Sequence, residues 1–141
     1  MEPIIRPARQ TDLAFVTSSY LKTMRARTPY NCMTSDVYYP HQRKRIENAL
    51  QVGDCYVLAN PEDPDHIFGY AVVEHLSAGD IVHFVYIKFP FRKMGLARKL
   101  FAQVVRDQAT TLVSHTTDSN FDRLAHKYKL IYDPYVLGEA L

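Results

Sequence analysis

The sequence has few cysteines, little net charge and no long hydrophobic run, and each shortage excludes a class of protein. Only two of its 141 residues are cysteines, Cys32 and Cys55, and neither has another cysteine in metal-ligand spacing, which argues against a zinc site. A disulfide between them stays open, although two buried, reduced thiols are the preferred interpretation. Seventeen Lys and Arg against fifteen Asp and Glu give a net charge of +2, too little to attract nucleic acid. The longest strongly apolar run, Ile81 to Ile87, is far shorter than the ~20 residues of a membrane span.

The composition is that of a globular protein with a single core. Apolar residues make up 47% and charged residues 23% of the chain, and no segment has the composition of a linker or a repeat. We therefore expect one domain over residues 1–141. The first residues show no basic segment followed by an apolar one, so we expect no secretory signal and a cytoplasmic, reducing location.

Periodicity and turn residues predict an alternation of strands and helices. Apolar residues at helical spacing follow Thr11 and Asp12 and predict a first helix. Residues 29–39 are expected to be irregular. Pro40 is expected to lie in the first turn of a second helix. Three strands joined by short loops should then form an antiparallel meander. The expected strands are Ile4–Arg6, Cys55–Ala59, Ile67–Glu74, Ile81–Lys88, Thr111–Ser114 and one within Ile131–Leu137, with a loop at 60–65 and later helices at Gly95–Asp107 and Ser119–Tyr128. The prediction is an α/β (α+β) fold, a mixed and mostly antiparallel sheet flanked by helices on both faces.

One stretch combines several features that suit phosphate binding. The predicted strand Ile81–Lys88 leads into a basic turn that opens directly onto an amphipathic helix. The first amides of a helix lack intrahelical partners and carry partial positive charge, and Gly95 lets the backbone approach a ligand closely. Formal positive charge comes from Arg92, Lys93, Arg98 and Lys99. The turn is therefore a candidate pyrophosphate site, although a solvated basic helix face at a common strand–helix junction remains the competing interpretation.

The same turn resembles a known family. Arg92-Lys93-Met94-Gly95-Leu96-Ala97 is similar to the Arg/Gln-x-x-Gly-x-Gly/Ala signature of the GNAT N-acetyltransferases. The segments Ile5–Leu13, Val85–Ile87 and Arg98–Phe101, and the order of elements, fit the same family. The stretch from His83 to Leu100 also looks like small GNAT-like proteins encoded by bacteriophages.

The resemblance implies a GNAT-like acyl-CoA N-acyltransferase fold and acetyl-CoA as the donor. By that resemblance, the backbone amides of Arg92, Lys93, Met94, Gly95, Leu96 and Ala97 would hold the pyrophosphate. Val85 and Ile87 would hydrogen-bond the pantetheine arm, and the Ile87 amide would polarise the thioester carbonyl. The side chains of Val85 and Ile87 can also simply pack in the core. No metal is implied, and the acceptor is an amine of unknown identity.

Direct acyl transfer also needs a base, for which His83 is the first candidate. In a regular strand His83 shares a face with Ile81, Val85 and Ile87, and a neutral imidazole suits proton abstraction near neutrality. The competing interpretation is a hydrogen-bonded histidine within the sheet. Asp80 stands at the start of the same strand, and Glu74 and His75 on the neighbouring strand are alternative bases.

Tyr128 is the candidate acid that would protonate the leaving thiolate, with Tyr132 as second choice. The family's Asn-x-x-Ala-x-x-x-Tyr context is shifted here by one position, running from Asn120 to Tyr128, and packing of Tyr128 at the core edge is an equal alternative.

Other polar groups have weaker assignments. His115-Thr116-Thr117 are expected to be a polar loop near the cleft, Tyr30, Asn31, Tyr38 and Tyr39 lie where the family builds its acceptor wall, and Gln42-Arg43-Lys44-Arg45 are expected to be a solvated helix face.

Two functions from different classes follow. The first is an acetyl-CoA-dependent N-acetyltransferase. The second is a GNAT-fold binding protein without catalysis, such as a phage virion-associated or host-interaction protein, for which the location would be the host cytoplasm. The sequence determines neither the acceptor nor the oligomeric state.

Overall fold

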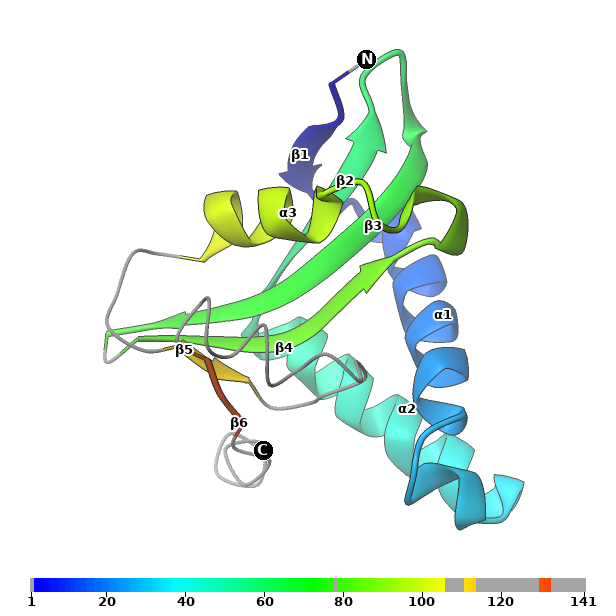
Figure 1. Ribbon diagram of the computed structural model, residues 1–141. Coiled ribbons are helices and arrows are strands. Elements are labelled where there is room, and N and C mark those ends of the chain that lie inside the picture. The colour runs from blue at the N-terminus through cyan, green and yellow to red at the C-terminus, as the bar shows by residue number, and fades with distance from the viewer. Residues whose placement is uncertain (1, 78, 106–110, 114–129, 133–141) are drawn as a thin grey trace.

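The computed structural model describes residues 2–77, 79–105, 111–113 and 130–132. It shows a twisted sheet with two helices on one face and a third helix on the other (Figure 1). The strands are β1 (Ile4–Pro7), β2 (Asp54–Asn60), β3 (Asp63–Leu76), β4 (Gly79–Ile87), β5 (Thr111–Val113) and β6 (Leu130–Tyr132). The helices are α1 (Leu13–Arg25), α2 (Ser35–Val52) and α3 (Leu96–Val104), with short 3-10 turns η1 (Gln10–Asp12), η2 (Tyr30–Cys32) and η3 (Phe89–Phe91).

The strands lie in the sheet in the order of the sequence, from β1 to β6. β1 to β4 pair antiparallel with their neighbours, whereas β5 pairs parallel with β4 and β6 pairs parallel with β5. The predicted meander and the predicted mixed, mostly antiparallel sheet are confirmed.

The sheet buries an apolar layer on each face, as a sheet covered on both sides must. On one face α1 and α2 pack against alternate residues of β2, β3 and β4, and on the other face α3 covers the remaining set. The first layer includes Val16, Tyr20, Met24, Tyr38, Ile46, Val57, Tyr70, Val72 and Phe84. The second includes Leu58, Ala71, Val73, Val82, Ile87, Leu96, Leu100 and Val104.

The expected start of the second helix at Pro40 is wrong, because α2 begins at Ser35. Thr34 has the extended backbone of a helix N-cap, and Tyr38, only 1% exposed, donates a hydrogen bond of 2.5 Å to the Leu21 carbonyl on α1. This buried aromatic contact holds the first turn of α2 in place, and it outweighs the unfavourable placement of proline inside a helix.

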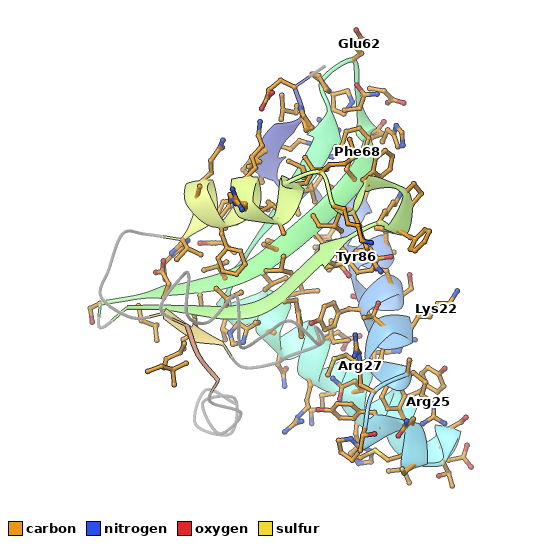
Figure 2. The ribbon with its side chains drawn as sticks, viewed as in Figure 1. Lys22, Arg25, Arg27, Glu62, Phe68 and Tyr86 are labelled. Atoms are coloured by element: carbon orange, nitrogen blue, oxygen red, sulfur yellow. The ribbon has the colours of Figure 1, made fainter. Side chains whose placement is uncertain are left out.

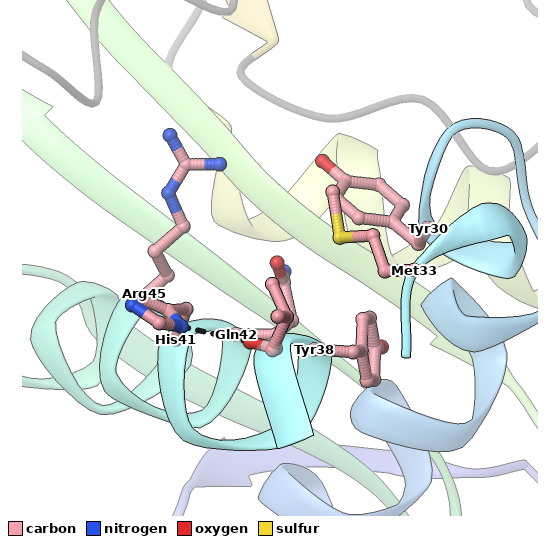
Figure 3. Close-up of a pocket in the computed structure, with 7 residues that line it drawn as sticks. Tyr30, Met33, Tyr38, His41, Gln42 and Arg45 are labelled. Atoms are coloured by element: carbon pink, nitrogen blue, oxygen red, sulfur yellow. Dashed lines mark hydrogen bonds between the residues drawn. The ribbon is translucent and has the colours of Figure 1, made fainter. Parts of the chain in front are cut away.

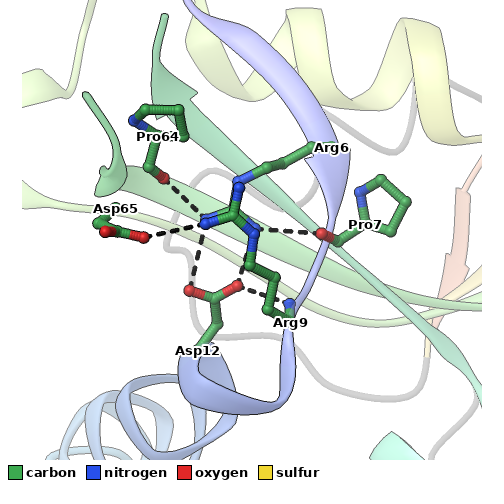
Figure 4. Close-up of polar contacts among 6 residues, drawn as sticks. All are labelled: Arg6, Pro7, Arg9, Asp12, Pro64 and Asp65. Carbon is green, nitrogen blue, oxygen red and sulfur yellow. Dashed lines mark hydrogen bonds and ion pairs between the residues drawn. The ribbon is translucent and has the colours of Figure 1, made fainter. Parts of the chain in front are cut away.

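The expected loop over residues 60–65 is also wrong, because β3 already begins at Asp63. The Asn60 side chain accepts a 2.9 Å hydrogen bond from the Glu62 amide, which closes a tight turn at Pro61 and Glu62. Arg6 on β1 then donates to the Pro64 carbonyl at 2.8 Å and pairs with Asp12 at the start of α1 (Figure 4). These bonds stabilise the first residues of β3, whose composition indicates a loop.

The cysteines differ from expectation in one case. Cys55 is partly buried, and burial raises the pKa of its thiol to about 12, but Cys32 is exposed on η2. Both are free thiols. Within the described residues, no helix is both long and apolar enough to cross a membrane. The same part of the chain contains no group of three His, Cys, Asp or Glu side chains arranged to hold a metal ion.

Candidate functional site

The end of β4 has one backbone edge along which the described residues supply no partner strand. The Lys88 amide donates to the Phe68 carbonyl on β3, at 2.8 Å, and Tyr86 lies opposite Tyr70. Because alternate residues of an antiparallel strand direct their amides to opposite neighbours, Val85 and Ile87 direct theirs away from β3. On that side the described part of β5 pairs only with Ile81 and Val82 of β4. The amides of Val85 and Ile87 are therefore directed toward a side on which the described residues supply no strand.

The turn that follows β4 contains two residues with left-handed backbone just before α3. Lys93 and Gly95 adopt left-handed backbone conformations, with φ of 64° and 76°. Gly95 forms the N-cap of α3, and beyond its chain neighbours no atom of the described residues lies within 4 Å of the position that its Cβ would take. The first amides of α3 thus open onto free space at the positive end of the helix dipole. The residues present fit a phosphate group.

Aromatic contacts anchor this turn to the sheet. The Phe91 and Phe68 rings lie 4.3 Å apart between centroids, and the Arg92 guanidinium lies 5.8 Å from the centroid of the Tyr86 ring. Arg92 Nε donates to the Ile87 carbonyl at 2.8 Å. Phe68 and Tyr86 both lie near the end of the sheet from which the turn departs (Figure 2).

The four basic side chains of the turn and the start of α3 have different environments. Arg92 is held against the end of β4, and Lys99 forms an ion pair with Glu2. Lys93 and Arg98 are exposed. Two apolar side chains beside the turn are also exposed, Phe89 to 80% and Met94 to 64%. The turn therefore offers free positive charge together with unburied apolar surface.

The prediction that His83 shares a face with Val85 and Ile87 is wrong. A β-bulge makes Val72 and Val73 of β3 pair with Phe84 and Val82, so that His83 is the extra residue. Val82 joins Val85 and Ile87 in the layer under α3. Sequence reasoning assumed strict alternation, which a bulge interrupts.

His83 instead forms a pair with Glu74. Its Nε2 lies 3.1 Å from Glu74 Oε1, and the imidazole is 1% exposed. Burial lowers the pKa of His83 below its ordinary value, and the hydrogen bond to Glu74 opposes part of that shift. The imidazole is therefore neutral near pH 7 and is oriented by a carboxylate, which is the state that a base requires.

The alternative base His75 belongs to a second polar chain. Its Nδ1 lies 2.9 Å from Asp80 Oδ1, and its Nε2 lies 3.2 Å from the Tyr56 hydroxyl. Asp80 is 1% exposed. Both ring nitrogens of His75 therefore have partners, so proton abstraction by His75 would first require loss of one of these contacts.

Other predicted site residues divide into three groups. Tyr128 and His115–Thr117 lie outside the described residues, and Tyr132 is described only as part of β6. Arg43, Lys44 and Arg45 are exposed as expected. Gln42, also expected in that solvated face, is instead 3% exposed. Its spacing of four from both Tyr38 and Ile46, which are buried on α2, is the signal that sequence reasoning missed.

The fold is shared with solved acetyltransferase structures. A Corynebacterium glutamicum protein named "histone acetyltransferase HPA2 and related acetyltransferase" superposes with a TM-score of 0.63 at 16% identity, over 90% of this chain and 83% of that chain. A Clostridium difficile protein described as a possible acetyltransferase gives 0.60 at 16% identity, over 94% and 92%. A Desulfovibrio desulfuricans protein described as a "putative acetyltransferase of the GNAT family" gives 0.58 at 14% identity, over 89% and 82%.

The chain has the fold of the GNAT acetyltransferases. Sequence comparison adds nothing to this, since no protein-family model and no curated protein matches the chain. At these identities the likeness concerns the arrangement of elements, and the chemistry depends on the residues themselves.

Proposed function

We propose that this protein is an acetyl-CoA-dependent N-acetyltransferase that acts by direct attack of an acceptor amine. The observation that carries the proposal is the junction of β4 and α3. Amides of Val85 and Ile87 face an open strand edge, and that edge leads into a turn whose left-handed residues expose the start of α3. An extended arm that ends in phosphates matches both features, and the shared fold supports the same assignment.

The residues have separate tasks in this mechanism. Acetyl-CoA supplies the activated acetyl group, with its pyrophosphate against the amides of 92–97. The Ile87 amide stabilises the negative charge that develops on the carbonyl oxygen. His83, oriented by Glu74, takes the proton that the amine loses as the nitrogen–carbon bond forms and the carbon–sulfur bond breaks. The thiolate takes a proton from Tyr128, Tyr132 or solvent.

Binding of acetyl-CoA can be tested by thermal unfolding. Ligand at 100 times its dissociation constant should add about 2.7 kcal/mol to the free energy of unfolding. Gly95→Glu would place a negative side chain where the phosphates lie and should abolish the shift. Gln51→Glu, which adds the same charge at an exposed position of α2, is the control and should retain it. If folded Gly95→Glu binds as tightly as wild type, the donor site lies elsewhere.

The burial of His83 favours one alternative, a GNAT-fold binding protein without catalysis. A base at 1% exposure needs access to the amine that it deprotonates. One measurement distinguishes the enzyme from the binding protein. It is the release of the CoA thiol from acetyl-CoA in the presence of a panel of small amines and lysine peptides. Acetyl-CoA binding without any thiol release would support the binding protein, whether virion-associated or host-directed, and would contradict the enzyme.

A further inference from the structure

A second candidate site lies in the helical layer, between η2 and α2. A cavity of about 310 Å³ is lined by Tyr30, Met33, Val37 and Tyr38, with His41, Gln42 and Arg45 as its polar residues (Figure 3). Its volume is at the lower end of the roughly 300–1,000 Å³ typical of small-molecule sites. Tyr38 belongs to the core layer under α1 and α2, so the cavity lies on the face of the sheet opposite α3.

Gln42 gives this cavity a polar group without a partner. The residue is 3% exposed, and its Nε2 makes no hydrogen bond with any described residue. Figure 3 shows the amide directed from α2 into the space beside Tyr30 and Met33. Because an unpaired buried donor is unfavourable, the position suits a ligand that supplies the missing acceptor.

The walls around Gln42 are fixed by contacts of their own. The Tyr38 hydroxyl donates to the Leu21 carbonyl at 2.5 Å, and Arg25 Nη1 donates to the Tyr30 carbonyl, also at 2.5 Å. The Arg25 guanidinium lies 4.9 Å from the centroid of the Tyr38 ring, and the Tyr30 and Tyr38 rings lie 6.0 Å apart. A ligand would therefore meet a preformed aromatic surface, which reduces the entropy lost on binding.

The charge of the lining residues favours an anion. None of these seven residues is acidic, and Arg45 makes no ion pair with any described residue. His41 Nδ1 lies 2.8 Å from the Val37 carbonyl, which orients its ring along α2. An ammonium group would find no counter-charge here, whereas a carboxylate would find a guanidinium and a carboxamide donor.

We infer that this cavity binds a small carboxylate with an apolar body. The carboxylate accepts hydrogen bonds from Gln42 Nε2 and Arg45, and the apolar body packs against Tyr30, Met33 and Val37. This binding uses none of the residues of β4 or of the turn before α3, whereas Tyr30 and Tyr38 lie in the segment where the GNAT resemblance implies an acceptor wall.

Titration calorimetry with 3-phenylpropionate as the probe tests this inference. The acid should bind at least tenfold more tightly than its neutral amide, and 3-phenylpropylamine should bind more weakly still. Arg45→Gln should weaken binding of the acid by about tenfold, in line with a charge-assisted hydrogen bond. Arg43→Gln removes the same charge from an exposed position of α2 that does not line the cavity, and should leave binding unchanged.

Gln42→Met separates the role of the amide from that of packing. Methionine keeps the length of the side chain and removes the unpaired donor, so the variant should bind the acid at least tenfold more weakly while its melting temperature stays equal or rises. Equal binding of acid and amide, equal loss in the Arg43 and Arg45 variants, or unchanged affinity in Gln42→Met would overturn the inference. The absence of any heat of binding at millimolar probe would overturn it as well.

Discussion

The pairing of His83 with Glu74 makes a specific prediction at the scale of single residues. If His83 is the base, activity falls at low pH as the imidazole becomes protonated, and this acidic limb lies below the ordinary histidine pKa of about 6.5. Glu74 raises the pKa of His83 against the larger lowering by burial. Glu74→Gln should therefore move the limb to still lower pH, as measured from kcat between pH 4.5 and 8.

Removal of the imidazole provides the companion test. His83→Ala should reduce kcat by roughly 10²–10⁴ while the affinity for acetyl-CoA stays nearly constant. His66→Ala removes an exposed histidine of β3 and serves as the control with unchanged turnover. Equal turnover in the two variants would exclude His83 from the mechanism.

Asp12 is the residue whose charge most directly joins β1 to α1. Its carboxylate accepts hydrogen bonds from Arg6 Nη1 at 2.8 Å and from the Arg9 amide at 2.6 Å. The bond to Arg6 is the main cause that holds the pKa of Asp12 below its usual range. The stability that it contributes is therefore complete above the ordinary carboxyl pKa and is lost as the pH falls through the lower folded-state pKa.

Asp12→Ala should accordingly lower the free energy of unfolding by about 3 kcal/mol at pH 7, because it leaves a largely buried guanidinium without its partner. Asp65, whose side chain is 82% exposed in its ion pair with Arg9, is the matched control, and Asp65→Ala should cost about 0.5 kcal/mol or less. Urea denaturation at pH 7 and pH 3 measures both, and the cost at Asp12 should be smaller at pH 3. Equal costs for the two variants would contradict the structural role of Asp12.

At the scale of elements, the contact between β3 and the end of β4 depends on Gly69. A Cβ at this position would lie 2.4 Å from the Tyr86 carbonyl oxygen and 2.6 Å from Ile87 Cδ1. Gly69→Ala should therefore displace the end of β4, cost about 1–3 kcal/mol of stability and weaken acetyl-CoA binding. Gly95→Ala meets open space and should cost about 1 kcal/mol through its left-handed backbone alone. Chemical denaturation and acetyl-CoA titration of both variants would test the difference.

Elements with a consistent local pattern could be predicted from the sequence, and those governed by distant contacts could not. The spacing of Leu13, Val16, Tyr20 and Met24 indicated α1 correctly, because the last three of these residues form one buried stripe. The start of α2 was missed since the bond from Tyr38 to Leu21 joins residues 17 positions apart. The extension of β3 through Pro64 was missed for the same reason, as Arg6 and Pro64 are 58 positions apart.

At the scale of the whole molecule, the candidate site also combines features that follow from the local sequence with features that depend on distant contacts. The left-handed Gly95 at the start of α3 follows from the local sequence of the turn. The edge of β4 that has no described partner depends on how far β5 pairs along it, and no residue of β4 encodes that register. The bulge at His83 likewise depends on β3, so neither its partner Glu74 nor its burial could be derived from alternation. The burial of Gln42 could have been predicted from the sequence, since helical spacing alone places it beside Tyr38 and Ile46.

The order of strands in the sheet has a consequence for how the chain folds. β2, β3 and β4 are joined by tight turns, with Asn60 opposite Asp63 and Leu76 opposite Gly79, so their pairing closes only short loops. The pairing of β4 with β5 closes a longer loop that contains α3, because a parallel partner needs a crossover. We therefore expect the amides of β2 and β3 to gain protection early in pulsed hydrogen-exchange refolding. The amides of Val85 and Ile87 should stay exchangeable until acetyl-CoA is added, because the ligand then takes the place of a strand along the end of β4.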